Sequence, residues 1–113
     1  MDQLSKLNFP GLISAEVKDV LDEREWLDVF PALDNVDRFN LLIRLNNEGP
    51  LFHNELMERI GLKPGILSHH LNKLMAVSLV NNEYVTPTTT ERHYSKYFIT
   101  EKGREILTIL LKK

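Results

Sequence analysis

The stretch of this sequence that decides its fold is Gly61-Leu62-Lys63-Pro64-Gly65-Ile66-Leu67-Ser68-His69-His70-Leu71-Asn72-Lys73-Leu74. Gly61 favours the end of a helix, because glycine adopts the left-handed backbone that caps a helix C-terminus. Pro64 suits the first turn of the next helix, where a missing backbone N–H costs nothing. The stretch therefore predicts a tight turn that leads into a new helix.

The helix predicted from about residue 64 to residue 76 is amphipathic. One face carries the apolar residues Ile66, Leu67, Leu71, Leu74 and Met75. The opposite face carries Gly65, Ser68, His69, Asn72 and Lys73. A short helix over about 55–60 comes before the turn, so the pattern is that of a helix-turn-helix.

The segments after this motif predict a hairpin and a last helix. Leu79 opens a strand that reaches about Thr86, 87–92 form a polar tip, and 93–99 are rich in residues that favour strands. Thr100 caps a helix with an apolar tail, Ile106-Leu107-Thr108-Ile109-Leu110-Leu111.

Two further helices are expected before the motif. One runs from about Asn35 to Asn47, and Leu51-Phe52 after it can pair at a sheet edge. The other runs from Ser14 to Phe30 and is ended by Pro31. Val17, Val20, Leu21, Arg24 and Leu27 fall on one stripe of this helix, with Trp26 and Phe30 at the edge.

Composition limits the class of protein. The chain has 113 residues, enough for one compact domain, with 42% hydrophobic and 27% charged residues. It has no cysteine, which excludes disulfides and thiolate zinc sites. The apolar runs are too short to cross a bilayer, and the N-terminus lacks a signal-peptide pattern. We therefore expect a cytoplasmic protein with no membrane partner.

Charge is unevenly distributed along the chain. Residues 1–60 carry 6 Lys+Arg and 12 Asp+Glu, whereas residues 61–113 carry 8 and 4, so the net charges are −6 and +4. Such an asymmetry is a hint that one surface meets a polyanion. Ordinary solvated charge explains the same numbers.

Two strings resemble known regulators. Ser68–Leu74 is similar to the Ser-x-His-Leu-x-x-Leu string of ArsR-like families, within a stretch that resembles the recognition region of winged helix-turn-helix regulators. Tyr97–Arg104 resembles the Tyr-x-Leu-Thr-x-x-Gly junction between wing and C-terminal helix in PadR-like and MarR-like proteins. The resemblance covers about residues 33–108.

The resemblance implies a mainly α protein with a small β-hairpin (α+β), a winged helix-turn-helix with extra N- and C-terminal helices. Residues 1–32 would be an N-terminal helical extension, 33–99 the DNA-binding domain and 100–113 a C-terminal helix. Ser78 stands where the family usually has glycine, at a position that often needs positive φ. The cysteine metal motif of ArsR-type sensors is missing, and the first thirty residues match no family that we can name.

The same resemblance places helix 64–76 in the DNA major groove and the wing, about 86–96, on the backbone or minor groove. The DNA-binding residues would be Lys63, Pro64, Gly65, Ser68, His69, Asn72, Lys73, Thr89, Arg92 and Lys96. The alternative is a solvent-exposed helix face and an ordinary polar hairpin.

Chemistry of other kinds is not indicated by the sequence. His69 and His70 are adjacent, so they diverge by about 100° on a helix and cannot easily share a metal ion. His70 points closer to the apolar stripe, as a packed and hydrogen-bonded side chain would. No metal-ligand spacing, phosphate-binding glycine loop or nucleophile motif occurs, so we expect no cofactor, no metal and no enzyme activity.

The terminal helices carry more apolar residues than a small domain needs, which favours a homodimer formed through them. An intrachain clasp between the two helices is the alternative. Two other functions remain open: a winged-helix module that binds a protein instead of DNA, and a regulator with an effector pocket lined by Trp26, Phe30 and Phe39.

Overall fold

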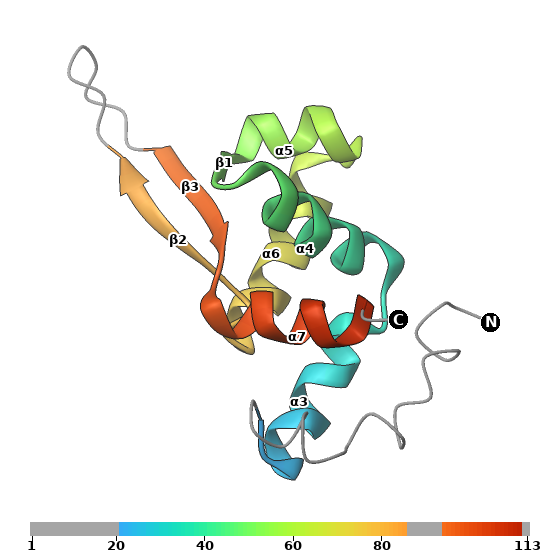
Figure 1. Cartoon of the computed structure of the whole chain (residues 1–113). Coiled ribbons are helices and arrows are strands. Elements are labelled where there is room, and N and C mark those ends of the chain that lie inside the picture. Colours follow the sequence, from blue (N-terminus) through green and yellow to red (C-terminus); the bar gives the residue numbers. More distant parts are fainter. Residues whose placement is uncertain (1–20, 86–93, 112–113) are drawn as a thin grey trace.

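The computed structural model describes residues 21–85 and 94–111, in which five helices surround one side of a three-stranded sheet (Figure 1). In chain order the elements are α3 (Glu23–Leu33), α4 (Val36–Glu48), β1 (Leu51–Phe52), α5 (His53–Ile60), α6 (Pro64–Ala76), β2 (Val80–Val85), β3 (Tyr94–Ile99) and α7 (Glu101–Leu111). This is a winged helix-turn-helix with flanking helices, as the sequence predicted. In these residues no helix has both the length and the apolar character needed to span a membrane.

The sheet is antiparallel, with strand order β1-β3-β2. Leu51 lies opposite Tyr97, and Val80 lies opposite Ile99. The short Leu51-Phe52 segment therefore does pair at a sheet edge, as expected. Strands β2 and β3 extend away from the helices at one side of the molecule (Figure 1).

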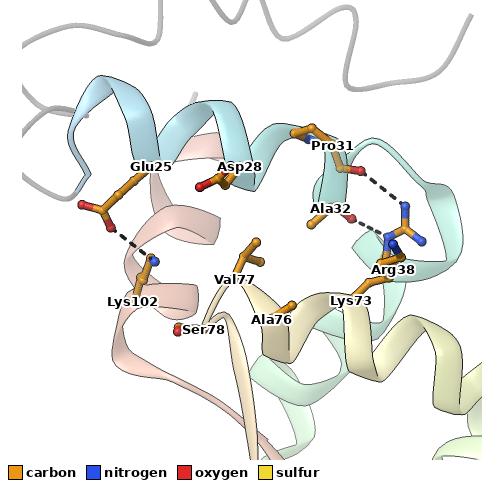
Figure 2. Close-up of a pocket in the computed structure, with 10 residues that line it drawn as sticks. All are labelled: Glu25, Asp28, Pro31, Ala32, Arg38, Lys73, Ala76, Val77, Ser78 and Lys102. Atoms are coloured by element: carbon orange, nitrogen blue, oxygen red, sulfur yellow. Dashed lines mark hydrogen bonds and ion pairs between the residues drawn. The ribbon is translucent and has the colours of Figure 1, made fainter.

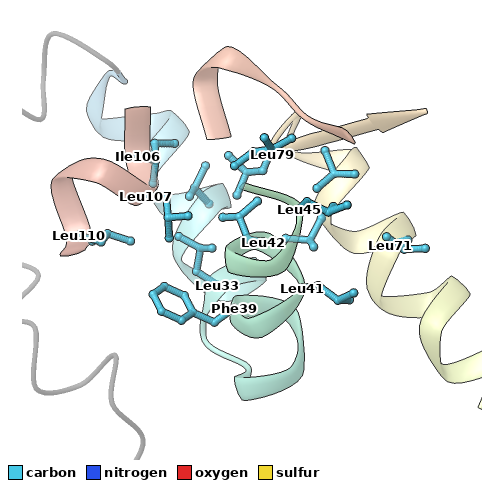
Figure 3. Close-up of a cluster of buried hydrophobic side chains, with 14 of the residues drawn as sticks. Leu33, Phe39, Leu41, Leu42, Leu45, Leu71, Leu79, Ile106, Leu107 and Leu110 are labelled. Atoms are coloured by element: carbon cyan, nitrogen blue, oxygen red, sulfur yellow. The ribbon is translucent and has the colours of Figure 1, made fainter. Parts of the chain in front are cut away.

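Helix α4 lies at the centre of the hydrophobic core (Figure 3). Leu41, Leu42 and Leu45 are fully buried on it. Phe39 on the same helix is also buried, and around it pack buried side chains from the other helices and from the residue before β2, among them Leu33, Leu71, Leu74, Leu79, Ile106, Leu107 and Leu110. Burial of this many leucine side chains supplies the main driving force for the fold.

The prediction for the first helix was wrong about where the helix begins and about where it ends. Asp22 caps α3, since its carboxylate accepts a hydrogen bond from the backbone N–H of Glu25 at 2.8 Å, so no continuous helix runs from Ser14 to Phe30. The helix also continues past Pro31 to Leu33. Burial of Ala32 and Leu33 stabilises this last turn despite the missing N–H of proline. Ser14, Val17 and Val20 lie outside the described residues.

The buried face of α3 also differs from the predicted stripe. Trp26, Val29 and Leu33 form its core face, whereas Leu27 is 72% exposed. Trp26 and Phe39 are buried in the core and Phe30 packs against Trp26, with ring centroids 4.7 Å apart. The cavity described beside α3 is lined by other residues, among them Pro31, Ala32 and Val77.

The C-terminal helix packs on its own chain. Ile106, Leu107 and Leu110 are buried in the core, and Leu111 is 50% exposed. Most of the apolar tail is therefore covered without a second subunit, because α7 lies beside α4 (Figure 3).

The junction between the wing and α7 is tightly connected. Thr100 caps α7, since its Oγ1 accepts a hydrogen bond from the N–H of Gly103 at 3.0 Å. The same hydroxyl donates to the carbonyl oxygen of Ser78 at 2.6 Å. Ser78 has φ 62°, the only positive φ of a non-glycine residue in the described ranges, as its position in the family pattern suggested. These bonds fix the angle at which the wing leaves the helices.

Candidate nucleic-acid interface

The helix-turn-helix consists of α5, a turn at 61–63 and α6. Gly61 ends α5 in the left-handed conformation, with φ 78°, and Pro64 occupies the first turn of α6. Leu67, Leu71 and Leu74 bury one side of α6 in the core. The opposite side, together with the residue before the helix, is exposed to solvent: Lys63, Pro64, Gly65, Ile66, His69, Asn72, Lys73 and Ala76. This exposed surface is called the α6 face below.

Ser68 does not lie fully on the α6 face. It is half-buried, and its Oγ lies 3.0 Å from Nε2 of His53 on α5. Ser68 is rotated by about 100° around the helix axis from the buried Leu67, so it lies at the border of the buried stripe. The helical pattern therefore placed Ser68 on the solvent side. The hydrogen bond ties the two helices of the motif together.

Ile66 was assigned to the wrong face. The helical pattern placed it in the core, but it is 47% exposed. It lies about 90° from the centre of the buried stripe formed by Leu67, His70, Leu71 and Leu74, and thus at its edge. An exposed apolar residue in the first turn of such a helix can contact a thymine methyl group.

His70 anchors α6 to the N-terminal part of the domain. It is 8% exposed, and its Nδ1 lies 3.2 Å from Nη1 of Arg38 on α4. Arg38 also donates from Nε to the carbonyl oxygen of Ala32 at 2.6 Å and from Nη2 to that of Pro31 at 3.3 Å. Arg38 thus links the last turn of α3 to α6, and the prediction of a packed, hydrogen-bonded His70 is confirmed.

The environment of His70 favours its neutral form. Burial and the adjacent Arg38 guanidinium lower the pKa of His70, and the carboxylate of Asp37, 3.8 Å from Nε2, offsets this only in part.

The electrostatics of the α6 face are positive. No Asp or Glu occurs from Gly61 to Asn82, and neither Lys63 nor Lys73 forms an ion pair with a described residue. By contrast, the cations of Arg44 and Arg59 are paired with Glu48 at 2.8 and 2.6 Å. These two hydrogen-bonded arginines lower the pKa of Glu48. The free positive charge of the motif is therefore concentrated on α6.

The wing is described only at its base. Thr89 and Arg92 lie outside the described residues, and so does His93. Lys96 lies in the middle of β3, opposite Glu83 on β2 and Phe52 on β1. Its Nζ is 5.1 Å from the centroid of the Phe52 ring, a cation–π contact. Lys96 therefore belongs to the part of the wing nearest the helices.

Within residues 21–85 and 94–111, no three histidine, aspartate or glutamate side chains gather as a metal site would require. The fold, the exposed α6 face and the wing are those of a winged helix-turn-helix protein. Residues 36–82 match the family model of bacterial regulatory proteins of the arsR family, a match that spans less than half of the chain.

Solved structures share the fold. A transcriptional regulator homologue from Pyrococcus horikoshii OT3 has 22% sequence identity and a TM-score of 0.64, over 87% of this chain and 88% of that chain. HlyU from Vibrio cholerae N16961 has 23% sequence identity and a TM-score of 0.66, over 80% of this chain and 91% of that chain. The reduced form of HlyU has 26% sequence identity and a TM-score of 0.61, over 81% of this chain and 94% of that chain. No curated protein matches the sequence significantly.

Proposed function

We propose that this protein binds double-stranded DNA sequence-specifically as a homodimer and regulates transcription in the cytoplasm. Helix α6 lies in the major groove, and the wing, about 86–96, contacts the backbone or minor groove. Residues 33–99 bind DNA, and the segments 1–32 and 100–113 contribute to the dimer.

The observation that carries this proposal is the α6 face, which combines unpaired positive charge with hydrogen-bonding groups and carries no carboxylate. Lys63 and Lys73 contact phosphates, which positions the domain. His69 and Asn72 offer hydrogen bonds to base edges, and Ile66 offers an apolar contact. Pro64 and Gly65 begin the helix beside Lys63, and a Cβ added to Gly65 would meet nothing within 4 Å, which leaves room for the DNA backbone.

The remaining predicted contacts have different roles in this proposal. Ser68 orients α6 through His53 and reaches DNA only at the edge of the face. Thr89 and Arg92 contact DNA from the wing, and Lys96 adds positive charge at its base.

The homodimer is supported by apolar side chains that the chain leaves exposed near its ends. Leu27 on α3, Val36 at the start of α4 and Leu111 on α7 are 72%, 62% and 50% exposed. A partner subunit would cover them. The two α6 helices would then meet half-sites about 34 Å apart on a palindromic duplex.

Selection of duplexes from a randomised library tests this function. We expect enrichment of one motif with two symmetric halves. A variant with His69→Ala and Asn72→Ala should keep its helical circular dichroism, because both side chains are exposed. It should lose the preference for the selected duplex by about tenfold or more, since each good base contact contributes about 1–3 kcal/mol. Enrichment of no motif, with no duplex binding at low salt, would contradict the proposal and favour a protein partner.

A further inference from the structure

A cavity of about 430 Å³ lies between α3, the end of α6 and the start of α7 (Figure 2). Its apolar walls come from Pro31, Ala32, Ala76 and Val77, and its polar groups come from Glu25, Asp28, Arg38, Lys73, Ser78 and Lys102. The volume is in the range of cavities that bind small molecules in proteins.

Some of the charged groups that line this cavity form ion pairs with described residues, and others do not. Glu25 and Lys102 form an ion pair at 3.4 Å on one side. Asp28 and Lys73 line the same cavity, yet neither pairs with the other or with any other described residue. The guanidinium of Arg38 is bonded to two carbonyl oxygens and to a histidine, and to no carboxylate. The cavity therefore offers a free carboxylate on α3 and uncompensated positive charge where α4 meets α6.

Apolar surface separates these two ends. Figure 2 shows Val77 in the middle of the cavity, with Asp28 above it on α3 and Lys73 beside Arg38 at the far side. A ligand that fits this arrangement carries an ammonium group for Asp28, a carboxylate for Lys73 and Arg38, and an aliphatic segment over Val77.

We propose that this cavity binds a small zwitterion, whose ammonium and carboxylate groups are separated by a short aliphatic chain, and that binding weakens the contact of α6 with DNA. The second part rests on the proposed function, because Lys73 is also a phosphate contact there. A carboxylate that engages Lys73 competes with a DNA phosphate for the same ammonium group. Linkage requires that DNA weakens ligand binding by the same factor.

Isothermal titration calorimetry of the full chain tests the binding. The probes are γ-aminobutyrate, δ-aminovalerate and ε-aminocaproate, with caproate and n-hexylamine as analogues that lack one charge. We expect at least one zwitterion to bind saturably and more tightly than either analogue. Asp28→Asn should weaken binding of the zwitterion by about tenfold or more and leave the affinity for caproate unchanged. Glu58→Gln, at an exposed carboxylate on α5, is the matched control and should change neither affinity.

Two results would overturn the binding site. One is the absence of saturable heat for all three zwitterions with protein that is folded by circular dichroism. The other is equal binding by wild type and Asp28→Asn.

The coupling is tested by the anisotropy of a labelled duplex with and without a saturating zwitterion. We expect DNA affinity to fall about fivefold or more. Unchanged DNA affinity while the ligand is bound would refute the coupling alone. If no duplex binds in either condition, the proposed function fails, and calorimetry still decides whether the cavity binds the zwitterion.

Discussion

Ser78 stores backbone strain at the point where α6 gives way to β2. Its φ of 62° is in the left-handed region, which costs a residue with a Cβ about 1–2 kcal/mol. Two hydrogen bonds hold Ser78 in this conformation. Its N–H donates to the carbonyl oxygen of Met75 at 3.0 Å, and its carbonyl oxygen accepts from Oγ1 of Thr100 at 2.6 Å. Both bonds involve only the backbone of Ser78, so any residue can make them.

Ser78→Gly should therefore stabilise the protein. We expect the free energy of unfolding to rise by about 0.5–1 kcal/mol, since the relief of strain exceeds the entropy that glycine gains when unfolded. Ser78→Ala keeps the Cβ and is the control, for which no gain is expected. Urea denaturation measures both. A glycine variant no more stable than the alanine variant would show that the turn is unstrained.

His70 makes stability depend on pH. Its pKa is lowered in the folded state by burial and by Arg38, from an ordinary value of 6.5. As the pH falls through 6.5, the unfolded chain takes up the proton first, so the free energy of unfolding decreases. This contribution is complete above pH 6.5 and is lost as the pH falls to the lowered pKa.

His70→Gln should flatten the decrease in unfolding free energy below pH 6.5, because glutamine has no proton to gain. Asn72→Gln, an exposed change on the same helix that involves no ionisable group, should keep the slope of the wild type. Denaturant titrations at a series of pH values give these slopes. Equal slopes for wild type and His70→Gln would mean that other groups cause the dependence.

Among the elements, the contact of α7 with the wing junction depends on one glycine. A Cβ added to Gly103 would collide with the carbonyl oxygen of Leu79 and lie 2.9 Å from Cγ1 of Ile99. Gly103→Ala should cost about 1–3 kcal/mol, as overpacking does. Gly65→Ala is the matched control, because open space surrounds it and alanine favours helix by about 1 kcal/mol. Thermal denaturation should move the two melting temperatures in opposite directions; a neutral Gly103→Ala would contradict the close packing.

The sequence predicted most elements because their caps and periodicity are local. Gly61, Pro64 and Thr100 mark helix ends by their own chemistry, and the structure confirms all three. Helix α3 was predicted less well, since its last turn depends on long-range burial of Leu33 and on carbonyl contacts from Arg38. The predicted DNA-binding residues stay a prediction, although the structure shows the α6 part of them on one exposed face, apart from Ser68. The cavity was not predictable, because it joins residues from four helices.

At the scale of the whole molecule, the homodimer is a prediction about exposed apolar surface. Leu27→Glu combined with Leu111→Glu should shift sedimentation from dimer to monomer, since each change puts a charge at the surface that we expect to be buried between subunits. Tyr84→Glu is the control, because Tyr84 is 74% exposed but lies on the wing. A wild type that sediments as a monomer would contradict the dimer, as would a double variant that stays dimeric.

The central claim, that the α6 face binds DNA, is tested most directly by the anisotropy of a labelled mixed-sequence duplex at several salt concentrations. We expect affinity to fall steeply with salt, with a slope of log affinity against log salt of about 0.9 per phosphate contact. The double variant Lys63→Gln and Lys73→Gln should reduce the magnitude of that slope by the amount that nearly two phosphate contacts contribute. Arg44→Gln with Arg104→Gln removes the same charge from α4 and α7 and should leave the slope unchanged. No binding at low salt, or equal slopes for the two double variants, would contradict the account.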